Sequence, residues 1–135
     1  MAFFGAPVSH QNDPLRAVNV AVDMQQIFQH IVEENVHRDI RELGLGIGLN
    51  TGETIVGNIG SEKLMDYTVI GDTANVAKRL QEIAANRQIV IGQTTYDAVR
   101  EHVVVEELLR RDVEGRDDPI IYYNLKELIP SVQYA

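Results

Sequence analysis

Two side chains suited to binding an anionic ligand, Asn75 and Arg79, lie four residues apart. The segment 74–85 is predicted to be a helix, so both side chains would project from the same face. An amide beside a guanidinium, which is always charged and can hold two oxygens at once, suits an oxygen-rich anion such as a phosphate. A solvated helix face is the alternative that this spacing leaves open.

The residues before this helix are predicted to form a strand that leads directly into it. The strand covers 66–70 and reaches the helix through a bend at Gly71, with Asp72 or Thr73 as the N-cap. Thr68 lies on this strand, where a β-branched side chain is by itself an ordinary strand former. The helix would turn its apolar positions toward the core: Val76, Leu80 and Ile83.

A long amphipathic helix is predicted to begin near Asp13 and Pro14. Asp13 would cap the first free amides, and Pro14 would occupy the first helical position, where its missing N–H costs nothing. The apolar positions form a broad stripe that would lie on a sheet: Leu15, Val18, Val22, Met24, Phe28 and Ile31.

A strand over 43–49 alternates aliphatic residues with Gly44, Gly46 and Gly48. Because interior glycines weaken a strand, this pattern indicates that a helix, another subunit or a ligand approaches the glycine face closely. The dinucleotide-binding pattern G-x-G-x-x-G is not completed here, which argues against a Rossmann fold. A turn over 50–53 is predicted to return the chain as the second strand of a hairpin, 54–60.

The C-terminal third is rich in predicted strands, with a short helix over 94–99 and a turn over 114–119 between the last two strands. The strands are 88–92, 103–106, 108–113 and 120–125. Together the elements predict one α+β domain over 1–128, with helices on one face of a mainly antiparallel sheet, and a tail over 129–135.

Composition excludes several classes of function. A net charge of −8, from 12 Lys and Arg against 20 Asp and Glu, argues against nucleic acid or a membrane surface as a partner. Without cysteine there are no disulfides, thiolate zinc sites or cysteine nucleophiles. No apolar run approaches the ~20 residues of a membrane span. We therefore expect a cytoplasmic domain, or one on the cytoplasmic face of a membrane-anchored parent.

Four motifs follow one another along the chain: MAFFGAP at 1–7, IGLNTG at 47–52, VGNIG at 56–60 and DYTVIGDTANVAKRL at 66–80. In this order and spacing they resemble the catalytic domains of the class III nucleotidyl cyclases, the adenylate and guanylate cyclases. The resemblance covers nearly the whole chain and implies the ferredoxin-like fold of that family.

This resemblance implies conversion of a nucleoside triphosphate to its 3′,5′-cyclic monophosphate and pyrophosphate. The site would lie between two subunits, in a homodimer or with a second cyclase domain. Asn75 matches the asparagine that orients the ribose, and Arg79 matches the arginine that stabilises charge developing on the α-phosphate. Arg116 falls near a basic position that binds phosphates.

Thr68 matches the position that reads the base, seven residues before Asn75. Threonine there is similar to one subgroup of adenylate cyclases, so ATP is the expected substrate. A hydroxyl can both donate and accept a hydrogen bond, so GTP remains the alternative.

The resemblance also implies two Mg²⁺ or Mn²⁺ ions bound by two aspartates, of which the second lies just before the Met-Ala-x-Phe-Gly segment. This sequence begins at that Met. It is therefore expected to lack both metal ligands and the base-contacting lysine. The first strand, two helices and second strand of the family's fold are expected to be absent as well. Asp66 and Asp72 match a strand entry and a helix start and are not proposed as substitutes. The histidines show no metal-ligand spacing: His10, His30, His37 and His102.

The chain by itself is expected to have no cyclase activity, because metal and substrate bind across an interface to which it would bring one half. The unpaired sheet edge is expected to favour dimers or swapped association. A non-catalytic regulatory or dimerisation module of the same fold is the remaining alternative. Incubating the purified chain with ATP and Mn²⁺ tests this expectation, and turnover well above the blank would contradict it.

Overall fold

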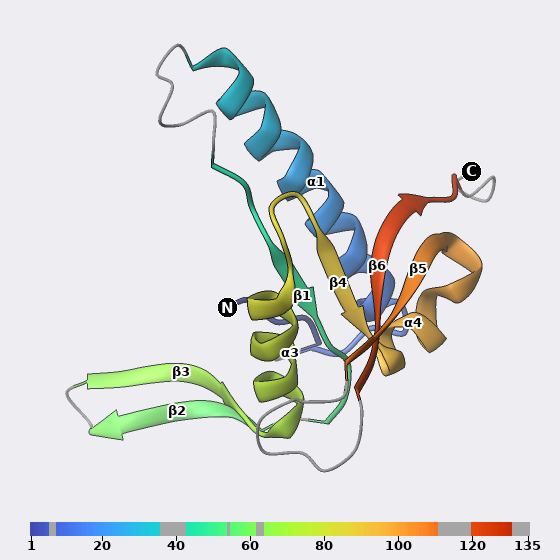
Figure 1. Cartoon of the computed structure of the whole chain (residues 1–135). Coiled ribbons are helices and arrows are strands. Elements are labelled where there is room, and N and C mark those ends of the chain that lie inside the picture. Colours follow the sequence, from blue (N-terminus) through green and yellow to red (C-terminus); the bar gives the residue numbers. More distant parts are fainter. Residues whose placement is uncertain (6–7, 36–42, 54, 62–63, 111–119, 131–135) are drawn as a thin grey trace.

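Figure 1 shows the computed structural model of the chain, which describes residues 1–5, 8–35, 43–53, 55–61, 64–110 and 120–130. The helices are α1 (Asp13–Glu34), α3 (Asp72–Ile83) and α4 (Gln93–Val99), followed by a 3₁₀ turn over Arg100–His102. The strands are β1 (Ile47–Leu49), β2 (Ile55–Ser61), β3 (Leu64–Ile70), β4 (Ile89–Gly92), β5 (Val103–Arg110) and β6 (Ile120–Leu128).

The main sheet has the strand order β1-β4-β6-β5. The β4–β6 and β6–β5 pairs are antiparallel and the β1–β4 pair is parallel, so the described sheet is mixed but mainly antiparallel, as predicted. The two predicted strands 103–106 and 108–113 are one strand, β5, with a register shift between Val104 and Val105. Residues 111–113, the predicted turn 114–119 and most of the predicted tail, 131–135, lie outside the described residues.

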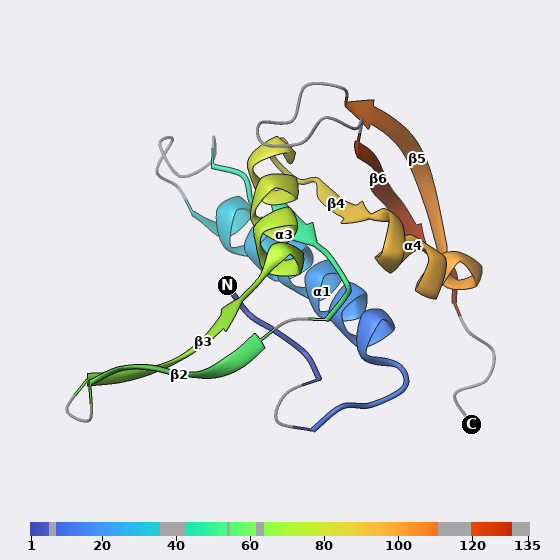
Figure 2. The same cartoon turned by 90° about the horizontal axis from the view of Figure 1, so that it is seen from below.

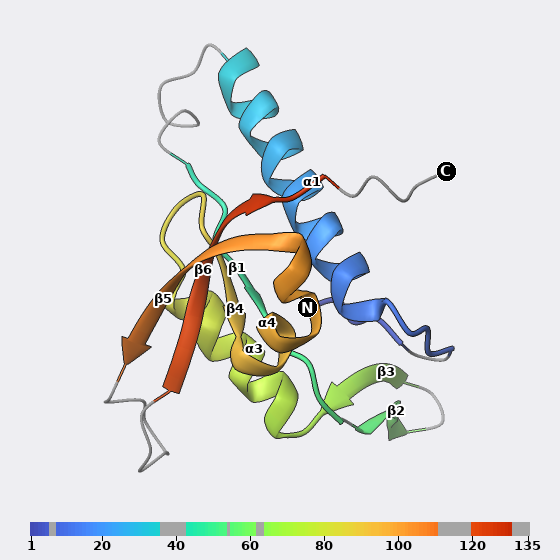
Figure 3. The same ribbon diagram turned by 90° about the vertical axis from the view of Figure 1, so that its right-hand side faces the viewer.

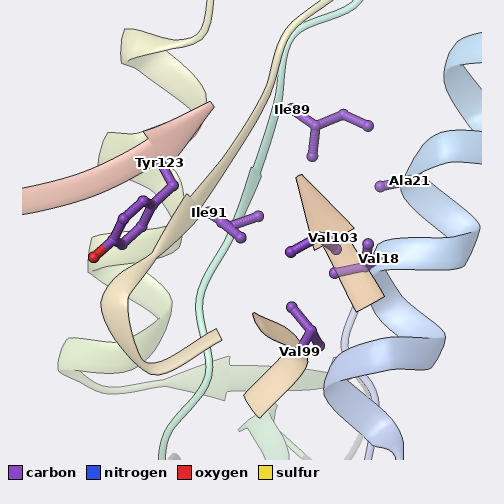
Figure 4. Close-up of a cluster of buried hydrophobic side chains, with 7 residues drawn as sticks. All are labelled: Val18, Ala21, Ile89, Ile91, Val99, Val103 and Tyr123. Carbon is purple, nitrogen blue, oxygen red and sulfur yellow. The ribbon is translucent and has the colours of Figure 1, made fainter. Parts of the chain in front are cut away.

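The helices cover both faces of this sheet, so the prediction that they lie on one face is wrong. All four residues of β4 are buried. Ile89 and Ile91 pack with Val18 and Ala21 of α1 (Figure 4). Val90 points the other way and packs with α3. Helices α1 and α4 therefore lie on one face and α3 on the other (Figure 3). This explains why β4 is a continuous apolar run with no polar alternation.

Strands β2 and β3 form a separate antiparallel hairpin that projects from the body of the domain (Figure 2). The predicted pairing of 54–60 with 43–49 is therefore wrong. Strand β1 instead pairs in parallel with β4, Ile47 opposite Ile89. The side chains of Asn50 and Thr51 bond to residues at the starts of α3 and α4, which directs the 50–53 loop toward those helices.

Helix α1 differs from its prediction at its start and along its apolar stripe. Asn12 is the N-cap, and Asp13 lies inside the first turn. There Asp13 accepts a hydrogen bond from the backbone N–H of His10 at 2.8 Å and pairs with Arg16 at 2.9 Å. These two contacts hold the pKa of the Asp13 carboxyl below its usual value. Of the expected stripe, Val18 is buried, whereas two members lie exposed on the surface: Met24 and Ile31.

No helix in the described part of the chain combines the length and the apolar character that crossing a membrane requires.

Candidate active site

Helix α3 rests directly on β1 at Gly48, and its C-terminal end lies beside Gly46, which precedes β1, so the predicted strand 43–49 is shorter than expected and covers only Ile47–Leu49. A Cβ added at Gly48 would lie 2.2 Å from the backbone N of Gln81 and 2.6 Å from the backbone O of Ala77. At Gly46 it would lie 2.9 Å from the backbone O of Ala84. The sequence left open whether a helix, another subunit or a ligand approaches these glycines. The structure shows a helix, and the backbone of α3 packs directly against the backbone at these glycines.

The buried side of α3 fixes which side chains it turns outward. Leu80 is buried against Val90 and Tyr122, and Val76 and Ile83 are partly buried around them, as predicted. Asn75 is consequently exposed and Arg79 half-exposed. Among the residues whose side chains the structure describes, neither group has a hydrogen-bond or ion-pair partner. An amide and a guanidinium are thus presented together at the surface, available to an anionic ligand.

The start of α3 is formed differently from its prediction. Gly71 is the N-cap, with φ at 140°, a backbone conformation that favours glycine. Asp72 and Thr73 follow it in the first turn of the helix. The Thr73 hydroxyl donates to the backbone O of Glu53 at 2.7 Å. Strand β3 therefore passes into α3 through a sharp bend at a single residue.

Thr68 lies on β3, in register with Gly57 of β2, so its backbone belongs to the hairpin that runs into α3. This places it on the strand predicted for it. Arg116 lies outside the described residues.

A polar network around the 50–53 loop was missed at the sequence level. The Asn50 side-chain amide donates to the backbone O of Thr73 at 3.1 Å. The Thr94 hydroxyl donates to the backbone O of Thr51 at 2.6 Å, and the hydroxyls of Thr51 and Thr95 are 2.8 Å apart. The available signal was an Asn-Thr pair after a strand, whose side chains often bond to nearby backbone.

The described residues do not contain a group of three or more histidine, aspartate or glutamate side chains placed to hold a metal ion. His10 contacts Asp13 and Arg16, and His30 pairs with Glu34 on the exposed surface of α1. His37 lies outside the described residues. This donor set does not fit a pair of divalent ions, so neither Mg²⁺ nor Mn²⁺ is assigned to it.

The strand–bend–helix unit and its two outward side chains can be compared with known families. The family model for the adenylate and guanylate cyclase catalytic domain matches residues 1–127. The chain belongs to this family. Its fold and its motifs at 47–52 and 66–80 are therefore those of a class III cyclase domain, as the sequence predicted.

Solved structures agree with this assignment. The guanylyl cyclase Cya2 is 36% identical, with a TM-score of 0.86 over 97% of this chain and 66% of that one. The adenylyl cyclase CyaB from P. aeruginosa is 25% identical, with a TM-score of 0.79 over 92% of this chain and 65% of that one.

Among curated proteins, the cytidylate cyclase of Escherichia coli is 28% identical over 98% of this chain. The cyclase domain described here spans 29% of that protein and just under two thirds of the two solved structures. The three relatives are named for three different nucleotides, so membership of the family leaves the base open.

Proposed function

We propose that this cyclase domain, assigned to residues 1–128, belongs to an adenylate cyclase that converts cytoplasmic ATP to 3′,5′-cyclic AMP and pyrophosphate. The observation that supports this most strongly is the outward face of α3, where Asn75 is exposed and Arg79 half-exposed. Both belong to the block 66–80 that resembles the family's most specific motif. Their surface position also counts against a purely structural role inside the core.

In this reaction the ribose 3′-hydroxyl gives up its proton and its oxygen attacks the α-phosphorus. The bond between the α-phosphorus and the oxygen of the β-phosphate breaks, and pyrophosphate leaves. Negative charge increases on the α-phosphate oxygens as the new bond forms. Arg79 would stabilise that charge with its fixed positive guanidinium, and Asn75 would orient the ribose through its side-chain amide. Because the described residues do not fit two divalent ions, no step is assigned to a metal held by this chain.

The site is proposed to be completed by a second subunit, either another copy or a second cyclase domain. Asn75 and Arg79 are accessible on an open face, and the β2–β3 hairpin that leads into α3 projects away from the domain (Figure 2). A projecting hairpin and an exposed ligand-binding face would allow substrate to be held between two chains.

GTP is the second candidate substrate, and one observation favours it. Cya2, which matches 97% of this chain at 36% identity, is a guanylyl cyclase. Thr68 is the proposed base-reading residue, and its hydroxyl is compatible with either purine.

Assays of the full-length protein, by which we mean the cyclase proposed to contain this domain, test this proposal with ATP, GTP and CTP in the presence of Mn²⁺. We expect kcat/KM for ATP to exceed that for GTP by about tenfold, which corresponds to ~1.4 kcal/mol. Replacing Thr68 by Val should narrow that ratio, whereas Thr68→Ser, which keeps the hydroxyl, should preserve it. Preferred turnover of GTP would establish the alternative substrate, and no turnover with any nucleotide would favour a non-catalytic module.

A further inference from the structure

One side-chain amide ties the first turn of α3 to the opposite face of the sheet. Nδ2 of Asn50 donates to the backbone O of Thr73 at 3.1 Å, two residues before Asn75. Oδ1 of the same amide lies 3.3 Å from the hydroxyl oxygen of Thr94 at the start of α4, whose single proton goes to the backbone O of Thr51 at 2.6 Å. Helix α4 packs on the face that α1 covers, so Asn50 connects helices of two different layers.

Helix α4 is a firmly held point of attachment. Thr95 is 1% exposed, and its hydroxyl bonds to that of Thr51. Tyr96 stacks on Tyr123 of β6 with ring centroids 4.1 Å apart, and the Tyr123 hydroxyl donates to Gln93 at 2.8 Å. A group bonded to this end of α4 therefore takes its position from the buried core.

The space for the Asn50 side chain is provided by Gly92. A Cβ at Gly92 would lie 2.6 Å from Oδ1 of Asn50, closer than real Cβ contacts allow. Thr73 is held from a second side by its own hydroxyl, which donates to the backbone O of Glu53. The 50–53 loop thus forms hydrogen bonds to Thr73, which directly precedes the segment that carries the two proposed nucleotide-binding side chains.

We propose that Asn50 is a positioning residue for nucleotide cyclisation, acting through α3 on the placement of Asn75 and Arg79. This inference rests on the proposed function. Misplacing a reacting or stabilising group by about 1 Å can lower a rate about 100-fold. Asn50→Asp removes the donor and places a carboxylate against the Thr73 carbonyl, so the first turn of α3 should shift.

The experiment compares Asn50→Asp with wild type, with Arg79→Ala and with the double variant, in the full-length protein with ATP or GTP and Mn²⁺. We expect kcat to fall about tenfold or more. KM should change less than about threefold, because the lost interaction acts mainly in the transition state. In the Arg79→Ala background the same substitution should lower kcat by a smaller factor than in wild type, because the part of its effect that passes through that guanidinium is already lost.

A matched control is Asn19→Asp on α1, where the amide also donates to a backbone carbonyl, that of Leu15 at 2.9 Å. It should leave kcat unchanged. Hydrogen exchange gives a readout independent of activity. The backbone N–H of Asn75, which donates to the backbone O of Gly71, should exchange faster in Asn50→Asp. If Asn50→Asp does not fold, Asn50→Ala removes the same donor and serves in the same comparisons.

Unchanged kcat in Asn50→Asp together with a large loss in Arg79→Ala would overturn the positioning role alone. A loss that is fully additive with Arg79→Ala would also overturn it, since that result indicates general destabilisation. Unchanged turnover in Arg79→Ala would overturn the proposed function, and the positioning role with it.

Discussion

Replacing Arg79 by alanine is expected to lower kcat of the full-length protein by about 10²- to 10³-fold. Losing one preorganised donor aimed at developing charge typically has an effect of this size, ~2.7–4 kcal/mol. In the proposed reaction the charge would appear on the α-phosphate during ring closure, so KM for the nucleotide should change much less than kcat. Steady-state production of the cyclic nucleotide at saturating substrate and Mn²⁺ measures the effect.

Lys78 provides the matched control, since it is the neighbouring cation on the same helix and is exposed. Lys78→Ala should leave kcat within about twofold of wild type, as surface substitutions usually have small effects. Arg79→Lys keeps the charge but loses the planar pair of donors, so it should recover only part of the activity. Equal losses in Lys78→Ala and Arg79→Ala would point to net charge and contradict the assigned role.

Replacing Gly48 by alanine is expected to cause a large loss of stability, because among the described glycines its added Cβ would make the closest contact with backbone atoms. The new Cβ would meet backbone atoms of Gln81 and Ala77 at 2.2 and 2.6 Å, and backbone cannot rotate away as a side chain can. Overpacking of this kind costs about 3 kcal/mol or more. Thermal unfolding followed by circular dichroism should show Tm lower by about 10 °C.

Gly46, which directly precedes β1, calibrates this expectation. At Gly46 the closest backbone atom is 2.9 Å from the added Cβ, and it belongs to Ala84 at the end of α3. Gly46→Ala should therefore destabilise the domain less than Gly48→Ala. At Gly52 the atoms met are those of the Thr73 side chain, which can move more easily. A Tm for Gly48→Ala equal to or above that for Gly46→Ala would show that α3 is not held by this contact.

Much of the fold was predictable from local patterns. Periodicity located α3 and its buried residue Leu80, and the apolar run 88–92 located β4. The glycines at 44, 46 and 48 predicted a close neighbour, because alternate positions without side chains leave an empty strip on a strand. These predictions succeeded because the signals lie within a single element.

The errors concern pairing between distant segments. The loop at Asn50 has the composition of a hairpin turn, yet its side chains bond to Thr73 and Thr95, far along the chain. No local pattern records such partners. The same applies to the second layer of helices: the apolar positions of β4 alone do not tell which helix covers which face.

In the candidate site, too, the features set within one element were predictable and those set by distant contacts were not. The spacing of Asn75 and Arg79 predicted a shared helix face, and the structure places both at the surface of α3. Asn50, whose side chain bonds to Thr73 in the first turn of that helix, acts through a tertiary contact and was missed. Thr68 stays a prediction for base recognition, and Arg116 stays one for phosphate binding.

The backbone contact between β1 and α3 has a mechanical consequence. In most layered domains, side chains lie between the backbone of a helix and that of the sheet beneath it, and a glycine in the strand removes this separation. At Gly48 no side chain separates β1 from α3, so the strand and the helix should move together as one rigid unit. A displacement of β1 should therefore be passed on to the backbone of α3, which carries Arg79.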